Sequence, residues 1–216
     1  MIIQPFTEGN FFHIHNYAAG NQQLFTSKAE VNFFLNLYLH IGSPVFDTYA
    51  YAILPDQFHF LLYVKENVWM PDQQGVPRLL NPTRTLLDIM SMYTQGVQER
   101  TGQAGMLFER PFRRRVLETE QQLKDRVLLL HQKALPITWG ESGRNESTVV
   151  NSYAAIVRGD NTLIKTEKVL SWFETIPAFV AAHHAPINES ALELSWAVAE
   201  PIAPLYNMGS ALKKAV

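Results

Sequence analysis

The segment from Tyr49 to Lys65, YAYAILPDQFHFLLYVK, constrains the fold more than any other part of the chain. Two apolar runs rich in aromatic and β-branched residues flank the turn pair Pro55-Asp56, so the segment predicts a β-hairpin. Side chains alternate along a strand, so Gln57 and His59 project from one face of the second arm and the phenylalanines beside them from the other. Two polar groups therefore point together from an apolar strand, which predicts either a site or the remains of one.

Composition narrows the class of protein. With 216 residues, of which 47% are hydrophobic and 18% charged, the chain predicts one soluble globular domain, residues 1–175, followed by a helical C-terminal extension, residues 176–216. No apolar run reaches the roughly 20 residues that span a bilayer. The start has neither a basic leader nor a small-residue cleavage site, so we expect no membrane partner and a cytoplasmic location.

The lack of cysteine and the small net charge exclude further classes. Without cysteine the chain has no disulfide, no thiolate nucleophile and no sulfur-ligated zinc, so histidine, carboxylate and amide groups are the available metal ligands. A formal net charge of -2 argues against a broadly basic surface. Any contact with nucleic acid therefore has to come from a local patch.

The segments around the hairpin predict the rest of the fold. Residues 10–16 alternate as a strand that places His13 and His15 on one face. Helical spacing of apolar residues predicts helices over residues 26–42, 83–100 and 119–134. Thr26 or Ser27 is the predicted cap of the first helix, with Glu30 as the capping-box partner of Ser27. A segment rich in proline and glycine, 66–82, predicts an exposed irregular loop. The order of strand, helix, hairpin, helix and strand predicts an α+β fold, a ferredoxin-like βαββαβ antiparallel sheet with helices on one face.

The stretch MLFERPFRRRVL, residues 106–117, is the most basic part of the chain and predicts two short extended pieces separated by a proline. Arginine side chains are phosphate partners, and an aromatic ring that stacks on an unpaired base contributes about 1 to 3 kcal/mol. The stretch is therefore either a DNA contact or a solvated basic edge strand that resists aggregation. The candidate DNA-binding residues are Phe108, Arg110, Phe112, Arg113, Arg114 and Arg115.

Four motifs in register resemble those of a known family. FFHIHN near the start, LPDQFHFLLYV on the hairpin, MLFERPF after the second helix and LLLHQKALP in the third resemble the single-tyrosine HUH transposases, particularly the REP-associated branch. The resemblance implies an enzyme that binds folded single-stranded DNA and cuts it with a tyrosine, which becomes a 5′-phosphotyrosine. It also implies that two strand histidines and a helix amide hold a divalent metal, Mg²⁺ or Mn²⁺, at the scissile phosphate.

Three of the four family positions are changed in this chain. The two strand histidines of the family fall on Gln57 and His59, the nucleophilic tyrosine on Leu129, and the amide ligand on Lys133. Leucine has no nucleophile, and a lysine ammonium has no acceptor and repels a metal. The resemblance therefore implies a family member that has kept the scaffold and lost strand transfer. Its catalytic positions are vestigial, and no cofactor is expected unless the site is still active. In that case His59 and the carbonyl oxygen of Gln57 are the expected ligands of the metal.

Three features leave alternatives open. His13 and His15 form a second H-x-H beside His59; they either form a three-imidazole zinc site with it or hydrogen-bond within the sheet. Lys133 is either a solvated lysine near a helix end or an ammonium that fills the metal position and hydrogen-bonds Gln57. Tyr93 and Tyr153 are candidates for a relocated nucleophile, although the place of Tyr93 on an apolar stripe favours a buried structural tyrosine.

These observations lead to three hypotheses of function. The first is a transposase-like protein that binds single-stranded or hairpin DNA without cutting it. The second is a protein-interaction or dimerisation module with a vestigial DNA face, in which Trp172 and Trp196 contribute contacts and a homodimer is one form of assembly. The third is an active nuclease with a relocated nucleophile. A gel-shift with hairpin DNA separates the three. The first predicts retardation without product, the second predicts neither effect, and the third predicts a cleaved product.

Overall fold

The computed structural model describes residues 5–72, 74–102, 104–109, 111–138 and 148–187. Its strands are β1 (Phe11–Tyr17), β2 (Phe46–Leu54), β3 (Gln57–Val64), β4 (Trp69–Pro71), β5 (Pro77–Leu79), β6 (Arg113–Leu117) and β7 (Val150–Asn151). Its helices are α1 (Lys28–Leu37), which continues into the π-helical turn η1 (Tyr38–Gly42), α2 (Pro82–Thr101), α3 (Glu120–Thr138), α4 (Tyr153–Arg158), α5 (Thr166–Phe173) and α6 (Ile176–Ala182).

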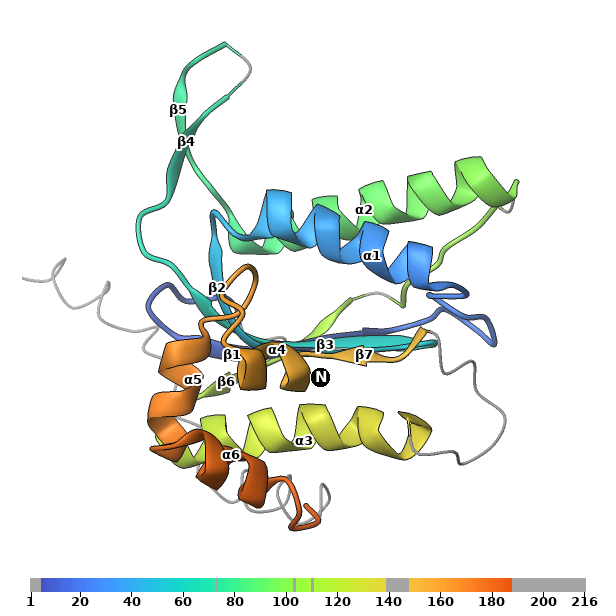
Figure 1. The fold of residues 1–216 in the computed structure, drawn as a ribbon. Coiled ribbons are helices and arrows are strands. Elements are labelled where there is room, and N and C mark those ends of the chain that lie inside the picture. The colour runs from blue at the N-terminus through green and yellow to red at the C-terminus, as the bar shows by residue number, and fades with distance from the viewer. Residues whose placement is uncertain (1–4, 73, 103, 110, 139–147, 188–216) are drawn as a thin grey trace, which may run out of the picture.

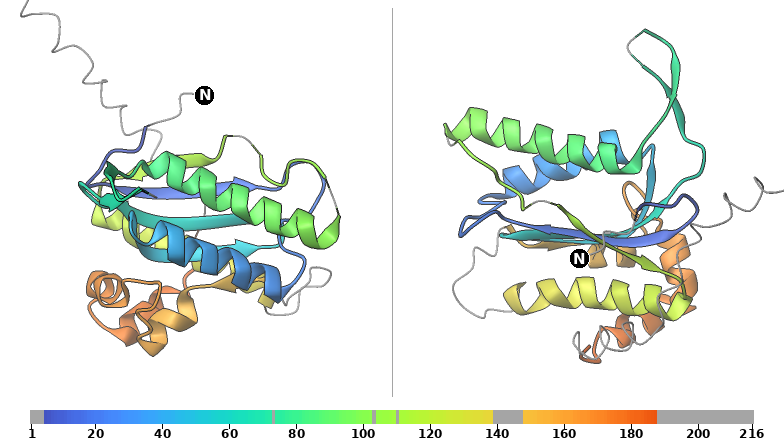
Figure 2. Two further views of the ribbon diagram at one scale, coloured as in Figure 1. Left: turned by 90° about the horizontal axis from the view of Figure 1, so that it is seen from above. Right: turned by 180° about the vertical axis from the view of Figure 1, so that it is seen from behind.

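A five-stranded antiparallel sheet in the order β6-β1-β3-β2-β7 forms the centre of the molecule. The predicted hairpin is confirmed as β2 and β3, and the α+β class is confirmed with it. The expectation of helices on one face was wrong. Helices α1 and α2 cover one face, and α3 lies on the other, where it packs over β2 and β3 (Figures 1 and 2).

The face under α1 and α2 holds an aromatic core. Phe12 and Ile14 of β1 and Phe60 of β3 are at most 1% exposed, and the ring of Phe34 on α1 packs against Phe60. The predicted cap of α1 is confirmed, because the side chain of Ser27 accepts from the backbone N–H of the third residue of the first turn. Apolar residues thus fill this side of the sheet, and the polar residues of β1 and β3 are directed to the other.

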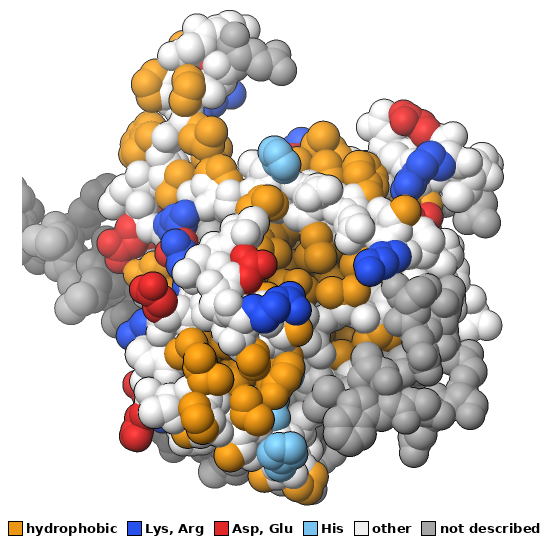
Figure 3. Space-filling view, viewed as in Figure 1, with side chains coloured by type: hydrophobic (Ala, Val, Ile, Leu, Met, Phe, Trp, Pro, Cys, Tyr) orange, Lys and Arg blue, Asp and Glu red, His pale blue; other side chains and the backbone are white. Residues whose placement is uncertain are grey.

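The segment from Glu66 to Pro82 differs from the predicted irregular loop. It forms a short antiparallel hairpin, β4 and β5, which stands out from the body of the molecule as an arm (Figure 1). The segment is exposed, as expected, yet much of what it exposes is apolar, and hydrophobic side chains on the arm are visible in Figure 3. The large hydrophobic residues that it exposes are Trp69, Met70, Val76 and Leu79.

The C-terminal part folds against α3. Helix α6 packs on α5, and the amide of Gln132 on α3 bonds to the backbone of Ala185 and Ile187. Trp172 is 3% exposed and stacks on a tyrosine of β2, so it is a core residue and not a contact surface. Trp196 and the rest of the extension lie outside the described residues, and the boundary at residue 176 stays a prediction. Among the described residues no helix is both long and apolar enough to cross a membrane.

Candidate functional site

The register of the sheet collects polar side chains on the α3 face. His15 of β1 lies opposite His59 of β3 on one side and Arg113 of β6 on the other, so these side chains form a row across three strands. The row beside it pairs His13 with Arg115. Because α3 packs over β2 and β3, His15, Arg113 and Arg115 are only half-buried, whereas His13 is buried.

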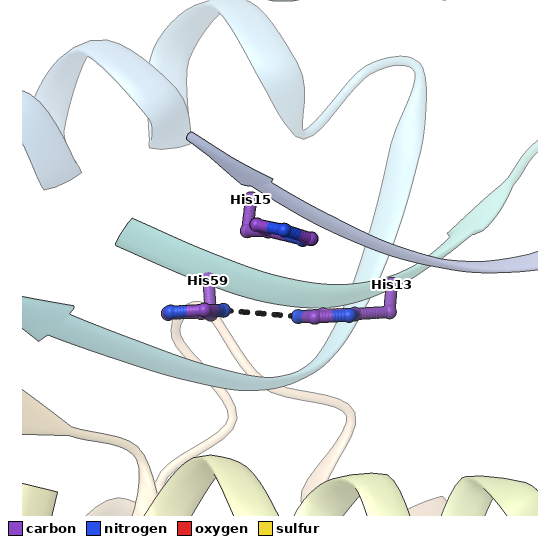
Figure 4. Close-up of side chains that lie close together, drawn as sticks. All are labelled: His13, His15 and His59. Atoms are coloured by element: carbon purple, nitrogen blue, oxygen red, sulfur yellow. Dashed lines mark hydrogen bonds between the residues drawn. The ribbon is translucent and has the colours of Figure 1, made fainter. Parts of the chain in front are cut away.

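The three histidines come together as the three-imidazole hypothesis requires. One ligand nitrogen from each of His13, His15 and His59 lies within 4.8 Å of the others. The rings of His13 and His59 are nearly coplanar, with 3.1 Å between Nε2 of His13 and Nδ1 of His59 (Figure 4). The ring of His15 stacks on both, with centroid distances of 4.8 Å and 5.2 Å.

Hydrogen bonding to Gln57 fixes the tautomer of His59. The amide nitrogen of Gln57 faces a carboxylate oxygen of Asp56 at 3.4 Å, which turns the amide oxygen toward Nε2 of His59 at 2.8 Å. Nε2 of His59 therefore carries the proton and donates, and its Nδ1 is an acceptor for the Nε2–H of His13. Nδ1 of His15 is buried and has no hydrogen-bond partner in the described part of the chain. A buried polar atom of this kind costs about 1–3 kcal/mol.

Burial and positive charge keep all three imidazoles neutral. Burial, then the Arg126 guanidinium, hold the pKa of His13 well below its usual value. Burial, then the neighbouring His15 and Lys133, do the same to the pKa of His59. Burial and the adjacent arginine of β6 lower the pKa of His15 to about 4. The site is therefore a set of neutral imidazoles in a positive potential.

Helix α3 presents Leu129, the position at which the resemblance implies a nucleophilic tyrosine, beside this site. Arg126, Leu129 and Lys133 recur at spacings of three and four, so they share one face of the helix. The charges of Arg126 and Lys133 act on the histidines, which places this face toward the cluster. Leu129 is 4% exposed and brings a hydrocarbon where the resemblance implies a tyrosine. One hypothesis for Lys133 required a hydrogen bond to Gln57. The side chain of Gln57 bonds to His59 and Asp56 instead.

The arginine stretch is divided between the two faces of the sheet. Arg113 lies on the histidine face, with its guanidinium 4.6 Å from the ring centre of Tyr17 and 3.0 Å from the carboxylate of Glu109. Arg115 shares that face by register. Arg114 points the other way, onto the rings of Phe6 and Phe112, and bonds to a threonine of α2.

The aromatic residues of the same stretch are buried. Phe108 and Phe112 are each 6% exposed and belong to the core, so neither ring presents a face on which a base can stack. Arg110 lies outside the described residues. Among the described residues of the predicted DNA patch, Arg113 and Arg115 are the ones on the histidine face.

An open groove of about 900 Å³ lies on the opposite side of the sheet, between α2 and residues 105–114. Arg114 reaches it from the basic stretch, and Met106, which is 61% exposed, forms part of its wall. The groove and the histidine cluster thus occupy different faces. On the face of the molecule shown in Figure 3, lysine and arginine side chains stand singly among acidic and hydrophobic ones.

Sequence reasoning missed two residues of the site. Tyr17 is half-buried, and its ring lies 5.6 Å from His15 and 6.4 Å from His59. Its place two residues after His15 on a strand was the signal available. Arg126 is 1% exposed and lies two turns before Lys133 on α3. A buried arginine is rare. The apolar residues around Arg126 in the sequence were the one indication that it is buried.

The comparisons with known proteins bear on the fold. No family model matches the chain, and no curated protein matches it in sequence. Among solved structures it is similar to a REP-associated tyrosine transposase bound to a REP hairpin, with a TM-score of 0.51 and 10% identity over 77% of this chain and 88% of that one. The chain shares the fold of that transposase. At this identity the likeness concerns the fold alone.

The residues present do not fit the metal site that the resemblance implies. Mg²⁺ and Mn²⁺ prefer oxygen ligands. The amide oxygen of Gln57 is turned to His59, and a lysine stands at the amide position of α3. The cluster instead offers three nitrogens from two adjacent strands, a different set of donors.

Proposed function

We propose that this protein binds hairpin or single-stranded DNA on the histidine face of its sheet and does not cut it. The observation that carries the proposal is the strip formed by Tyr17, His15, Arg113 and Arg115 along the half-buried edge of the sheet, beside the charges of α3. Arginines supply phosphate contacts, and the tyrosine supplies an aromatic ring at the same edge.

The fold supports this proposal. The chain has an α+β fold built on a five-stranded antiparallel sheet, and the transposase of similar fold is a protein bound to a DNA hairpin. The altered positions support the loss of cleavage, because Leu129 has no hydroxyl and Lys133 adds positive charge where the family has a metal ligand. Positive charge without a metal favours holding a phosphodiester over activating it for attack.

A gel-shift with single-stranded hairpin DNA, with and without Mn²⁺, tests the proposal. The expected result is retardation at low salt, with neither a cleaved strand nor a covalent protein–DNA product. Arg113→Glu and Arg115→Glu should weaken binding, and Arg115→Gln should reduce the slope of log affinity against log salt by about one. Arg84→Glu on α2, an exposed arginine paired with Asp88, is the matched control and should bind as the wild type does.

Two other outcomes would overturn the proposal. A covalent product would show a residual nuclease. Its nucleophile would then be sought at Tyr17, because its ring lies closest to the histidine cluster among the tyrosines considered, and Tyr17→Phe should abolish the product. An absence of both retardation and product would exclude DNA binding and leave the protein-interaction hypothesis.

The β4–β5 arm favours that second candidate function. Trp69 is 60% exposed at the base of a projecting hairpin, and the apolar side chains near it form a surface of the kind that partner proteins cover. A dimerisation module predicts that the mass in solution, measured by light scattering, rises with concentration and that Trp69→Ser prevents the rise. A monomer at every concentration would exclude self-association through the arm.

A further inference from the structure

We propose that His13, His15 and His59 form a binding site for a transition-metal ion of the zinc type, made by two neighbouring strands and independent of any contact with DNA. Three imidazoles are a donor set that suits Zn²⁺ and leaves a fourth position open. The donor set differs from the implied family site, because two of its members come from β1 and no amide takes part.

The spacing of two of the three nitrogens is close to that of a metal site. A Zn–N bond is about 2.0–2.1 Å long, which places two tetrahedral ligand nitrogens about 3.3–3.4 Å apart. Nε2 of His13 and Nδ1 of His59 are 3.1 Å apart and face each other. The metal replaces the hydrogen bond between them, and the His15 ring has to turn from its stacked position toward the ion, which the broad χ2 of histidine allows (Figure 4).

Outer contacts prepare the ligands for a metal. Gln57 holds the proton of His59 on Nε2, which leaves the Nδ1 lone pair directed into the cluster. A hydrogen bond to the second nitrogen of a ligating histidine is the usual arrangement in metal sites. Nδ1 of His15 has no other partner among the described residues, so ligation would satisfy a buried polar atom.

The positive charges nearby oppose the metal, and this opposition gives the proposal a distinctive test. Burial, together with these charges, keeps the imidazoles deprotonated, the form that binds metal. A potential that lowers a histidine pKa by one unit lowers the affinity for a dication by about 100-fold. Neutralising Lys133 should therefore strengthen metal binding, although it removes a side chain from the site.

Titration calorimetry with Zn²⁺ on the full chain, freed of metal by a chelator and without DNA, is the experiment. The expected result is one equivalent bound. His15→Ala should weaken binding by at least about tenfold, while Ala at the exposed His40 should leave it unchanged. Lys133→Gln should tighten binding, because it removes a positive charge that acts on the cluster. Co²⁺ should give the visible absorption of a tetrahedral nitrogen site in the wild type, a readout that needs no variant.

Three results would overturn the proposal. They are Zn²⁺ binding of equal strength in the wild type and His15→Ala, an octahedral Co²⁺ spectrum, and a weaker affinity in Lys133→Gln. Circular dichroism of each variant shows whether it is folded, and the Co²⁺ spectrum decides the question if His15→Ala is not. Because the calorimetry uses no DNA, a protein that fails to bind Zn²⁺ can still bind DNA in the gel-shift. A protein that fails to bind DNA can likewise still bind Zn²⁺.

Discussion

Nε2 of His59 donates a hydrogen bond to the amide oxygen of Gln57 over 2.8 Å, along the same side of strand β3. The contact links the one unaltered histidine of the implied family motif to the residue that stands in place of the other. It also leaves His59 with its lone pair on Nδ1, toward His13. Where the resemblance implies a second ligand histidine, Gln57 supplies a hydrogen-bond acceptor, so the strand is polar at this point.

Removing that acceptor should destabilise the fold. Gln57→Leu leaves the buried Nε2–H of His59 without its partner, and we expect the free energy of unfolding to fall by about 1–3 kcal/mol. Gln57→His keeps an acceptor nitrogen and should lose less. Urea unfolding measures the difference, and Gln23→Leu at an exposed position is the control. Equal midpoints for Gln57→Leu and the control would show that the hydrogen bond contributes nothing to stability.

Of the two described tryptophans, Trp172 should matter for stability and Trp69 should not. Trp172 is buried and stacks on Tyr49 with 5.3 Å between ring centroids, so Trp172→Ala should cost about 3–5 kcal/mol. Trp69→Ala removes a side chain that is 60% exposed and should change stability by less than about 0.5 kcal/mol. Thermal unfolding of both variants checks the contrast. A large loss in Trp69→Ala would show that the arm is packed in solution and is not a free surface.

Local patterns predicted most of the fold. The turn at Pro55-Asp56 and alternation on both sides of it identified β2 and β3, and the cap at Ser27 identified the start of α1. The position of α3 was not predictable in the same way. A helix with an apolar stripe can pack on either face of the sheet. The choice depends on which face carries the polar row at His15 and His59, and that is known only once the strands are paired.

The site was predictable in part. H-x-H spacing on one strand and His59 on another gave the three-histidine cluster, because alternation and antiparallel pairing decide which side chains meet. The same alternation divides the arginine stretch, since consecutive residues of a strand point to opposite faces and Arg114 does not share the face of Arg113 and Arg115. Arg126 could not be foreseen, because its burial depends on the packing of α3 against the sheet.

Tyr93 should prove structural. It is fully buried on α2, and its hydroxyl donates to the backbone carbonyl of Leu24 over 2.6 Å. Tyr93→Phe leaves that carbonyl without its donor, and we expect a loss of about 1–3 kcal/mol in urea unfolding with no change in DNA retardation. Tyr17→Phe is the matched control, because its half-buried hydroxyl has no hydrogen bond within the described residues. Loss of DNA binding in a folded Tyr93→Phe protein would contradict this assignment.

A chain of hydrogen bonds that holds α3 to α6 should make stability depend on pH. Nδ1–H of His183 donates to the carbonyl of Phe179, so its Nε2 accepts from Nδ1–H of His131 at 2.8 Å. Nε2 of His131 then accepts from the hydroxyl of Ser152 at 2.7 Å. The link between the two rings requires a neutral His183, since a second proton on its Nε2 would face the Nδ1–H of His131.

The pKa of His131 is lowered by burial and then by His183, and that of His183 by burial and further by His184, against a raising effect of its bond to Phe179. A lowered folded pKa means that the unfolded state binds more protons below about pH 6.5. The stabilisation is therefore complete above that pH and is lost as the pH falls, by about 1.4 kcal/mol per pH unit for each histidine.

Urea unfolding between about pH 8 and pH 5 checks this dependence. His183→Gln should flatten the profile below about pH 6.5 by about one proton, and Gln at the exposed His40 should keep the profile of the wild type. The comparison isolates the pair from the other buried histidines, because only the difference between the two profiles is used. If the profiles of both variants coincide, the link between His131 and His183 does not control the acid sensitivity of the fold.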